Sequence, residues 1–195
     1  LGFMGIFVPE EWGGAGMDHV SYSLAVEEIS RADASCGVIM SVNNSLTSWP
    51  LLAFGDEAQK ERWLRPMAAG DHLGAFCLSE PQAGTDAAAQ QTVAERDGDG
   101  YVLRGTKNWI TNGAHADTLI VFAMTDKPKG HAGISAFVVD AKAEGVVVAH
   151  TEKKMGIKAS DTAQLVFEDV KTIRARHGIR YFFFWDSLAP PRTLR

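Results

Sequence analysis

One segment of the chain has residue types suited to holding a flat, polar ligand close to the backbone. Residues 76–86 read Phe-Cys-Leu-Ser-Glu-Pro-Gln-Ala-Gly-Thr-Asp. A short apolar strand is expected to run here into a loop with two hydroxyls, a rigid proline and a glycine. Such a loop offers backbone N–H groups and short donors without bulk, which suits close approach to a heterocycle or a phosphate. An ordinary capped turn explains the same residues, so this segment alone does not decide between the two.

A second segment has a similar character. Residues 105–113 read Gly-Thr-Lys-Asn-Trp-Ile-Thr-Asn-Gly. In an extended chain Trp109 and Thr111 share one face, because side chains alternate along a strand. An aromatic body beside a hydroxyl suits a flat, partly polar ligand. The alternative is a core tryptophan followed by an Asn-Gly turn.

Other catalytic motifs are absent from the sequence. The glycine-rich stretch 9–16 lacks the Gly-Lys-Ser/Thr ending of a phosphate loop, and we interpret it as structural. No Gly-x-Ser-x-Gly occurs, so no serine-nucleophile elbow is expected. The six histidines do not fall at metal-ligand spacings beside cysteines or carboxylates, so we expect no metal site.

Helices are expected to fill residues 1–72. Asp18 is a plausible N-cap, and apolar residues follow it at helical spacing: Tyr22, Ala25, Val26 and Ile29. A second apolar stretch runs through residues 38–49, where Pro50 is expected to interrupt it. Asp56 and Gln59 resemble a capping box for a further helix that ends by Gly70.

Short β-rich runs separated by Gly, Asp and Pro replace this pattern in residues 73–170. The expected strands are 74–79, 92–96, 101–104, 118–124, 134–140, 146–150 and 163–168. The Asp-Gly-Asp-Gly stretch at 97–100 predicts a hairpin between two of them. Helices followed by strands predict an α+β fold, in which an N-terminal helical domain precedes a mainly antiparallel β-barrel or sandwich domain.

Composition limits the classes of partner. The 195 residues are 46% hydrophobic and 22% charged, ordinary values for a soluble globular protein, and no apolar run reaches the roughly 20 residues of a membrane helix. Residues 171–195 contain six basic residues and one acidic residue, a net charge of +5. Because the whole chain has a net charge of −5, residues 1–170 have a net charge of −10. Such a body repels nucleic acid. Two cysteines are too few for a disulfide framework, which favours a reducing compartment.

The last 25 residues break the pattern. The consecutive aromatic residues at 181–185 lie within a basic stretch rich in Pro and Arg, which fits neither strand alternation nor a helix face. We interpret 171–195 as an aberrant tail that does not belong to the fold, with a membrane-touching or partner-binding segment as the alternative.

The two polar segments together resemble the paired signature of the acyl-CoA dehydrogenase family. That family commonly has an aromatic-Cys-aliphatic-Ser/Thr-Glu-Pro-Gly-x-Gly-Ser-Asp strand and loop, followed by Lys-x-Trp-Ile-Thr-Asn. Here these are residues 76–86 and 107–112, and the resemblance extends to 8–14, 152–158 and 167–169. Residues 41–46 are most similar to the short-chain, butyryl-type branch. The resemblance spans essentially residues 1–170.

The resemblance implies a helical domain, a middle β domain and a C-terminal helical bundle, of which only the first two match this sequence. It implies that FAD is the cofactor. Ser79 would bond to the pyrimidine side of the flavin, Trp109 would pack against the isoalloxazine, and Thr111 would bond near N5. Thr85 stands where the family directs a serine hydroxyl toward acyl-CoA, and Gln82 departs from the usual glycine. The implied FAD-binding residues are Phe76, Cys77, Leu78, Ser79, Gly84, Thr85, Trp109, Ile110 and Thr111.

The implied reaction is α,β-dehydrogenation of an acyl-CoA thioester. In the family a carboxylate takes the α-proton and flavin N5 accepts the β-hydride. The family's catalytic glutamate lies in the C-terminal domain, so no catalytic residue is assigned here, and the chain is expected to be an inactive fragment that begins and ends inside the family pattern. Alternatives are an acyl-CoA oxidase or flavin monooxygenase of the same fold, and a binding remnant without chemistry.

The resemblance also implies partners and a location. Electron-transfer flavoprotein is the expected electron acceptor, and the full-length family is expected to form tetramers. The expected location is the cytoplasm in a bacterium or the mitochondrial matrix in a eukaryote.

Overall fold

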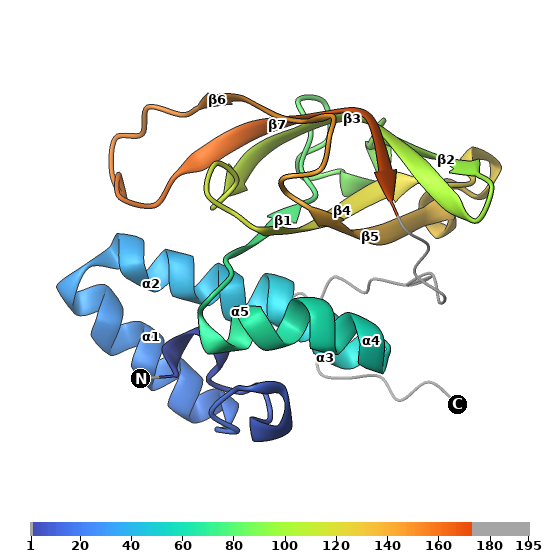
Figure 1. The fold of residues 1–195 in the computed structure, drawn as a ribbon. Helices are drawn as coiled ribbons and strands as arrows, with labels where there is room; N and C mark the ends of the chain where they lie inside the picture. The colour runs from blue at the N-terminus through green and yellow to red at the C-terminus, as the bar shows by residue number, and fades with distance from the viewer. Residues whose placement is uncertain (1, 173–195) are drawn as a thin grey trace.

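Helices and a curled sheet form two layers in the computed structural model, which describes residues 2–172. The helices end at Ala69 and the first strand begins at Gly74. Figure 1 shows the helices stacked against one side of the sheet. The predicted α+β fold, with helices first and a mainly antiparallel sheet second, is confirmed.

The first long helix, α1 (His19–Ala32), begins where the sequence predicts. The carboxylate of Asp18 accepts a 2.8 Å hydrogen bond from the Ser21 N–H, which satisfies a free donor of the first turn. The predicted apolar positions of α1 are half-buried, and Glu27 and Glu28 are exposed. Asp33 ends α1 and caps α2 (Ala34–Ser41) through the Ser35 N–H.

The expected interruption at Pro50 is wrong. Helix α2 continues through a π-helical turn, η3 (Val42–Ser48), into α3 (Trp49–Phe54), with Pro50 in the first turn of α3. The Trp49 N–H donates to the Asn44 carbonyl five residues earlier. Proline lacks an N–H and clashes with the carbonyl of the preceding turn, and a widened turn accommodates both defects. The π-turn η4 (Lys60–Leu64) precedes Pro66 in the same way.

The remaining helices end and begin as predicted. The capping box of α4 (Glu57–Gln59) has both of its reciprocal bonds, between Asp56 and Gln59. Helix α5 (Arg65–Ala69) ends at Gly70, which has a left-handed φ of 89°. Two short 3₁₀ turns, η1 (Phe3–Gly5) and η2 (Glu10–Trp12), precede α1.

Seven strands form one sheet. They are β1 (Gly74–Cys77), β2 (Val93–Asp97), β3 (Gly100–Thr111), β4 (Thr118–Met124), β5 (Ile134–Asp140), β6 (Val146–Thr151) and β7 (Thr162–Thr172). The order is β1-β4-β2-β3-β7-β6, and β5 pairs with β4. The 3₁₀ turns η5 (Ala87–Ala89) and η6 (Lys127–Gly133) lie in two of the connections. The predicted hairpin joins β2 and β3, with Asp97 paired to Gly100.

The two parallel pairings of the sheet create the loop that carries one polar segment. Strand β1 pairs with β4 through its whole length, and β2 pairs with β4 at Val93 and Met124. Strand β5 occupies the other edge of β4. Residues 78–92 therefore leave one edge of β4 and return to the same edge.

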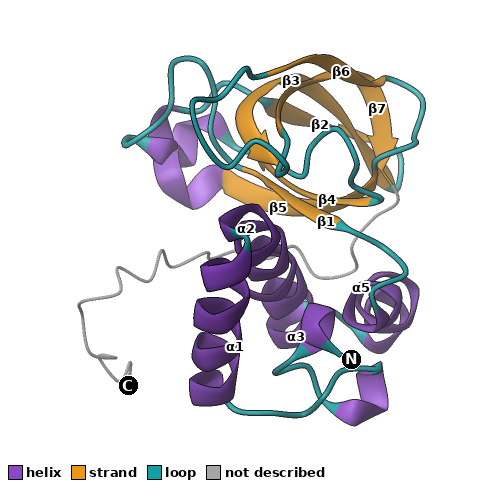
Figure 2. Ribbon diagram, turned by 90° about the vertical axis from the view of Figure 1, so that its left-hand side faces the viewer, coloured by secondary structure: helices purple, strands orange, loops and turns teal. Residues whose placement is uncertain are grey.

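Strand β4 lies between the two apolar cores. Leu119 and Val121 face the inside of the curled sheet, and Ile120 and Phe122 face the helices. Figure 2 shows β4 and β5 beside the helices, and the rest of the sheet curling away from them. Because both faces of β4 are covered, its sequence is a continuous apolar run rather than an alternating one.

The sheet extends slightly beyond its predicted end. Lys171 and Thr172 continue β7 and pair with Val102 and Tyr101. Two residues of the predicted tail therefore lie in β7, and the rest of that tail, 173–195, lies outside the described residues. Within residues 2–172, no helix combines the length and apolarity needed to cross a membrane.

Candidate functional site

A β-bulge in β3 shapes the second polar segment. Lys107 pairs with Leu165 of β7, and Ile110 pairs with Ala163. Between these two pairs β3 advances by three residues and β7 by two, so β3 contains one extra residue, as in a β-bulge. Trp109 has a φ of 56°, a left-handed conformation that is uncommon for a bulky residue. Such a conformation costs about 1–3 kcal/mol and is concentrated at functional sites.

The bulge turns Trp109 outward. Its side chain is 57% exposed, whereas Ile110 is buried and Thr111 is half-buried. The alternative of a core tryptophan is therefore wrong. The expectation of a plain extended chain at Trp109 is also wrong, because the bulge breaks the alternation, although the side chains of Trp109 and Thr111 both reach the surface.

The first polar segment divides into a buried strand and an exposed loop. The Cys77 side chain is fully buried, and burial raises the pKa of its thiol to about 12. Phe76 packs edge-on against Phe122, with ring centres 4.9 Å apart, on the face toward the helices. The side chains of Cys77 and Ile110 lie in the core, so any contact they make with a ligand would come from the main chain.

The loop after β1 begins with a tight turn. Glu80 and Ala83 exchange two backbone hydrogen bonds, of 2.9 Å and 3.1 Å. Gly84 and Thr85 follow and are exposed, while Leu78 and Ser79 before the turn are half-buried. The turn interpretation is therefore correct for residues 80–83, and it leaves Gly84 and Thr85 accessible to a ligand.

Direct contacts join the two polar segments. The Asn108 N–H donates a 2.8 Å bond to the Ser79 carbonyl. The Asn108 side-chain carbonyl accepts a 2.8 Å bond from the Gln164 amide of β7. The structure therefore brings the Ser79 end of β1 next to the bulge that carries Trp109.

A buried ion pair lies beneath this junction. The Lys107 ammonium is 2.7 Å from the Glu80 carboxylate, and both side chains are almost completely excluded from solvent. Burial alone would raise the pKa of Glu80, but hydrogen bonds from the Gln91 N–H, Lys107 and Thr92 lower it overall. Burial lowers the pKa of Lys107.

The far end of β3 is also held in place. The Asn112 amide donates a 3.0 Å bond to the Gly74 carbonyl at the start of β1. The Asn112 N–H donates to the Asp161 carbonyl, and the Asp161 carboxylate accepts a 2.8 Å bond from the Ala114 N–H. The Trp109–Thr111 stretch is thus attached on both sides.

The residues at the surface of this frame fit a flat, hydrogen-bonding heterocycle such as FAD. Within residues 2–172, the hydroxyls of Ser79, Thr85 and Thr111 make no hydrogen bond to another side chain or to the backbone. Three free hydroxyls and an exposed indole, all within the two polar segments, are the donor and stacking groups that such a ligand needs. The structure does not gather all nine predicted residues at the surface, because the side chains of Phe76, Cys77 and Ile110 point into the two cores.

Sequence reasoning gave no role to the residues that build the frame. Glu80 and Lys107 belong to the two signature segments, but their burial depends on the bulge and on the return of the loop to β4. Gln90, which accepts a 3.1 Å bond from Lys107, lies in neither segment. The sequence signal that could have predicted this ion pair was a lysine within a strand and a glutamate in the other segment.

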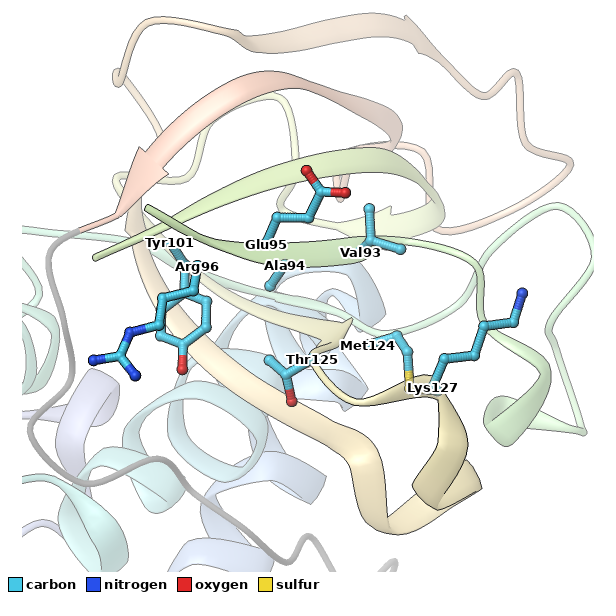
Figure 3. Close-up of a pocket in the computed structure, with 8 residues that line it drawn as sticks. All are labelled: Val93, Ala94, Glu95, Arg96, Tyr101, Met124, Thr125 and Lys127. Atoms are coloured by element: carbon cyan, nitrogen blue, oxygen red, sulfur yellow. The ribbon is translucent and has the colours of Figure 1, made fainter. Parts of the chain in front are cut away.

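A cleft of about 420 Å³ lies elsewhere on the sheet, along β2 and the start of η6 (Figure 3). Tyr101, Arg96 and Lys127 are among its lining residues, and no predicted site residue lines it. Arg96 bonds to the Gly98 carbonyl of the hairpin. Within residues 2–172, no three His, Cys, Asp or Glu side chains gather as a metal site would require.

Comparison with known proteins identifies two domains in the sequence. Residues 1–71 match the acyl-CoA dehydrogenase N-terminal domain, and residues 75–170 match the acyl-CoA dehydrogenase middle domain. The short-chain specific acyl-CoA dehydrogenase of Mus musculus mitochondria is 52% identical over 171 residues, which are 88% of this chain and 42% of the mouse protein.

Two solved structures have the same fold over this region. Butyryl-CoA dehydrogenase from Megasphaera elsdenii matches with a TM-score of 0.86 and 48% identity, covering 91% of this chain and 47% of that one. An acyl-CoA dehydrogenase complexed with FAD from Bacillus anthracis matches with a TM-score of 0.81 and 41% identity, covering 88% and 29%. The chain thus spans less than half the length of each of these three relatives.

Proposed function

The chain belongs to the acyl-CoA dehydrogenase family, and we propose that residues 2–172 hold FAD and acyl-CoA in an enzyme that dehydrogenates short-chain acyl-CoA thioesters. The observation that carries this proposal is the outward Trp109 on a left-handed bulge, attached to the Ser79 end of β1 by the Asn108 hydrogen bond. An exposed indole in a strained, well-held backbone is suited to pack against a flat ring.

The free hydroxyls and the indole would hold the cofactor. Ser79 would bond to the pyrimidine side of the flavin, Thr111 would bond near N5, and Trp109 would pack against the isoalloxazine. Gly84 and Thr85, both exposed, would contact the cofactor from the loop, and Thr85 would also contact the substrate. Phe76, Cys77, Leu78 and Ile110 contribute through the main chain, because their side chains are largely committed to packing in the cores.

Bound FAD supplies the hydride acceptor of the reaction. The chain's own residues orient the ring and exclude water from the face that Trp109 covers. Glu80 does not remove the substrate α-proton, because its buried carboxylate already accepts bonds from Lys107, Gln91 and Thr92. None of the described residues is assigned as the catalytic base.

The relatives favour a short acyl chain, because those with high identity include short-chain specific and butyryl-CoA enzymes. Electron-transfer flavoprotein is the proposed electron acceptor, and a homotetramer is the proposed assembly of the full-length enzyme. The proposed location is the cytoplasm in a bacterium or the mitochondrial matrix in a eukaryote.

The test is a visible absorption spectrum of the purified chain with FAD, before and after anaerobic addition of butyryl-CoA. A perturbed flavin spectrum supports the FAD site, and a further change on adding butyryl-CoA, without bleaching, supports binding of both ligands without a base. Bleaching would mean that the chain supplies the α-proton base after all. A spectrum equal to that of free FAD would contradict the proposed site. Rapid reoxidation of a bleached sample by oxygen would favour an oxidase or monooxygenase.

A further inference from the structure

The ion pair between Lys107 and Glu80 is almost completely buried, and the need to fill the core does not explain why charged residues occupy this place. The two side chains are 0% and 1% exposed, and their charged atoms are 2.7 Å apart. Replacing a buried ion pair by apolar residues of similar volume is often neutral or stabilising. A fold that needed only a filled core at this place would be served as well by two apolar side chains.

Glu80 closes the neck of the loop between β1 and β2. Its carboxylate accepts a 2.6 Å bond from the Gln91 N–H and a 3.0 Å bond from the Thr92 N–H, where the chain returns to the sheet. A third bond, of 2.8 Å, comes from the Gln82 amide. The place of Gly84 and Thr85 therefore depends on Glu80, because both lie between the two ends that this carboxylate joins.

Lys107 attaches β3 to the same neck. Its ammonium donates to the Leu78 carbonyl at 3.0 Å, to Glu80, and to the Gln90 side chain at 3.1 Å. An ammonium has three donors, so all three are used. Lys107 immediately precedes the bulge, so the same side chain sets where Trp109 stands relative to Ser79.

We propose that Glu80 and Lys107 are positioning residues of the flavin site, holding the Ser79 strand end, the Gly84–Thr85 loop and the Trp109 bulge in one geometry. This inference rests on the proposed function for its ligand. Neither side chain touches the cofactor, and both act through the backbone segments that they join. An apolar pair of the same volume fills the core but leaves the Gln91 and Thr92 N–H groups and the Leu78 carbonyl without these partners.

The test compares Lys107→Met with Leu103→Ala. Lys107→Met removes the link between the segments and keeps an unbranched side chain of similar length. Leu103 is fully buried in the same strand but belongs to the core inside the sheet, so Leu103→Ala controls for a loss of stability. If Lys107→Met does not fold, Glu80→Gln/Lys107→Met removes both charges and avoids an unpaired buried one.

Two quantities are measured on each folded variant. The first is the Kd for FAD, by titration at a temperature well below unfolding. The second is hydrogen exchange of the Asn108 amide, relative to the Val121 amide of β4. The Asn108 exchange rate reports the bond to Ser79 in the absence of FAD.

We expect Lys107→Met, or the double variant, to raise the Kd for FAD at least tenfold and to speed Asn108 exchange at least tenfold relative to Val121. Leu103→Ala should leave both within about threefold of wild type. The proposal would be overturned if the folded Lys107→Met or double variant bound FAD with a Kd within threefold of wild type. It would also be overturned if Leu103→Ala raised the Kd by the same factor as that variant. If the wild-type chain does not bind FAD, the proposed function fails. The exchange rate then decides, and an unchanged Asn108 rate would overturn the positioning role.

Discussion

The backbone N–H of Asn108 lies 2.8 Å from the carbonyl oxygen of Ser79, although β3, which holds Asn108, and β1, which ends just before Ser79, are not neighbours in the sheet order. This bond and the Lys107–Glu80 pair beneath it convert two separate sequence motifs into one surface. The motif residues that remain accessible include the Trp109 indole and three hydroxyls, while Glu80 and Lys107 are buried as supports.

Trp109→Ala should separate binding from stability. Because the indole is 57% exposed, its loss should lower the free energy of unfolding by less than the ~3–5 kcal/mol that a Trp→Ala change costs in a core. FAD binding should weaken by about 1 kcal/mol or more through lost stacking. Chemical denaturation and FAD titration measure the two. Val20→Ala removes another exposed apolar side chain, on α1, and should change neither. A large loss of stability in Trp109→Ala would show that the indole packs against the protein instead.

Thr111→Val should weaken FAD binding by about one neutral hydrogen bond, ~0.5–1.5 kcal/mol. Valine has nearly the same shape and is well accepted in strands, so the unfolding midpoint should stay close to wild type. The half-buried Thr106, on the same strand before the bulge, provides the matched control Thr106→Val. Equal FAD affinity in wild type and Thr111→Val, measured by titration, would remove Thr111 from the proposed contacts.

Glu80 should remain ionised at pH 4.5, the ordinary midpoint of a glutamate. Its pKa is lowered in the folded chain because hydrogen bonds from the Gln91 N–H, Lys107 and Thr92 outweigh the effect of burial. A lowered folded-state pKa contributes stability that is present above pH 4.5 and is lost as the pH falls through the folded-state value. The carboxyl ¹³C shift of Glu80, followed by NMR through an acid titration, measures this directly. Half-protonation at or above pH 4.5 would contradict the buried network.

One of the two cysteines should react in the native chain. Cys36 is exposed, whereas the Cys77 thiol is buried and its pKa is raised to about 12. Because the thiolate is the reactive species, a thiol reagent at neutral pH should label Cys36 quickly and Cys77 only after unfolding. Peptide mapping of the labelled chain distinguishes them. Rapid native labelling of Cys77 would mean that the β1 strand opens readily.

Gly74→Ala should destabilise the contact between the helices and the sheet. An added Cβ would lie 2.4 Å from the Thr47 hydroxyl oxygen and 2.8 Å from the Met67 sulfur. Overpacking of this kind costs about 1–3 kcal/mol, which thermal unfolding should report as a lower Tm. Gly156→Ala is the control, because no atom lies within 4 Å of its added Cβ. Equal Tm values for the two variants would show that the helices can move away from β1 without cost.

Local signals in the sequence determined much of the architecture. Asp18 starts α1, the Asp56 and Gln59 side chains start α4, and the stretch 97–100 turns β2 into β3. Each of these caps and turns depends only on residues within three or four positions of one another, so it can be predicted from the local sequence. The residue types of the two signature segments were compatible with a flat, polar ligand, and their resemblance to a family signature implied FAD.

Only the tertiary structure decided how those segments meet. The bulge that exposes Trp109 exists because β3 pairs with β7, more than 50 residues later, with one residue to spare. The burial of Lys107 depends on Glu80, 27 residues earlier, and on a loop that returns to the edge of β4. Pro50 remains helical because of a widened turn that propensity does not encode. Pairing and burial between distant segments are properties of the packed chain, and for that reason the sequence singled out the two segments but did not reveal which of their side chains reach the surface and which lie buried beneath them.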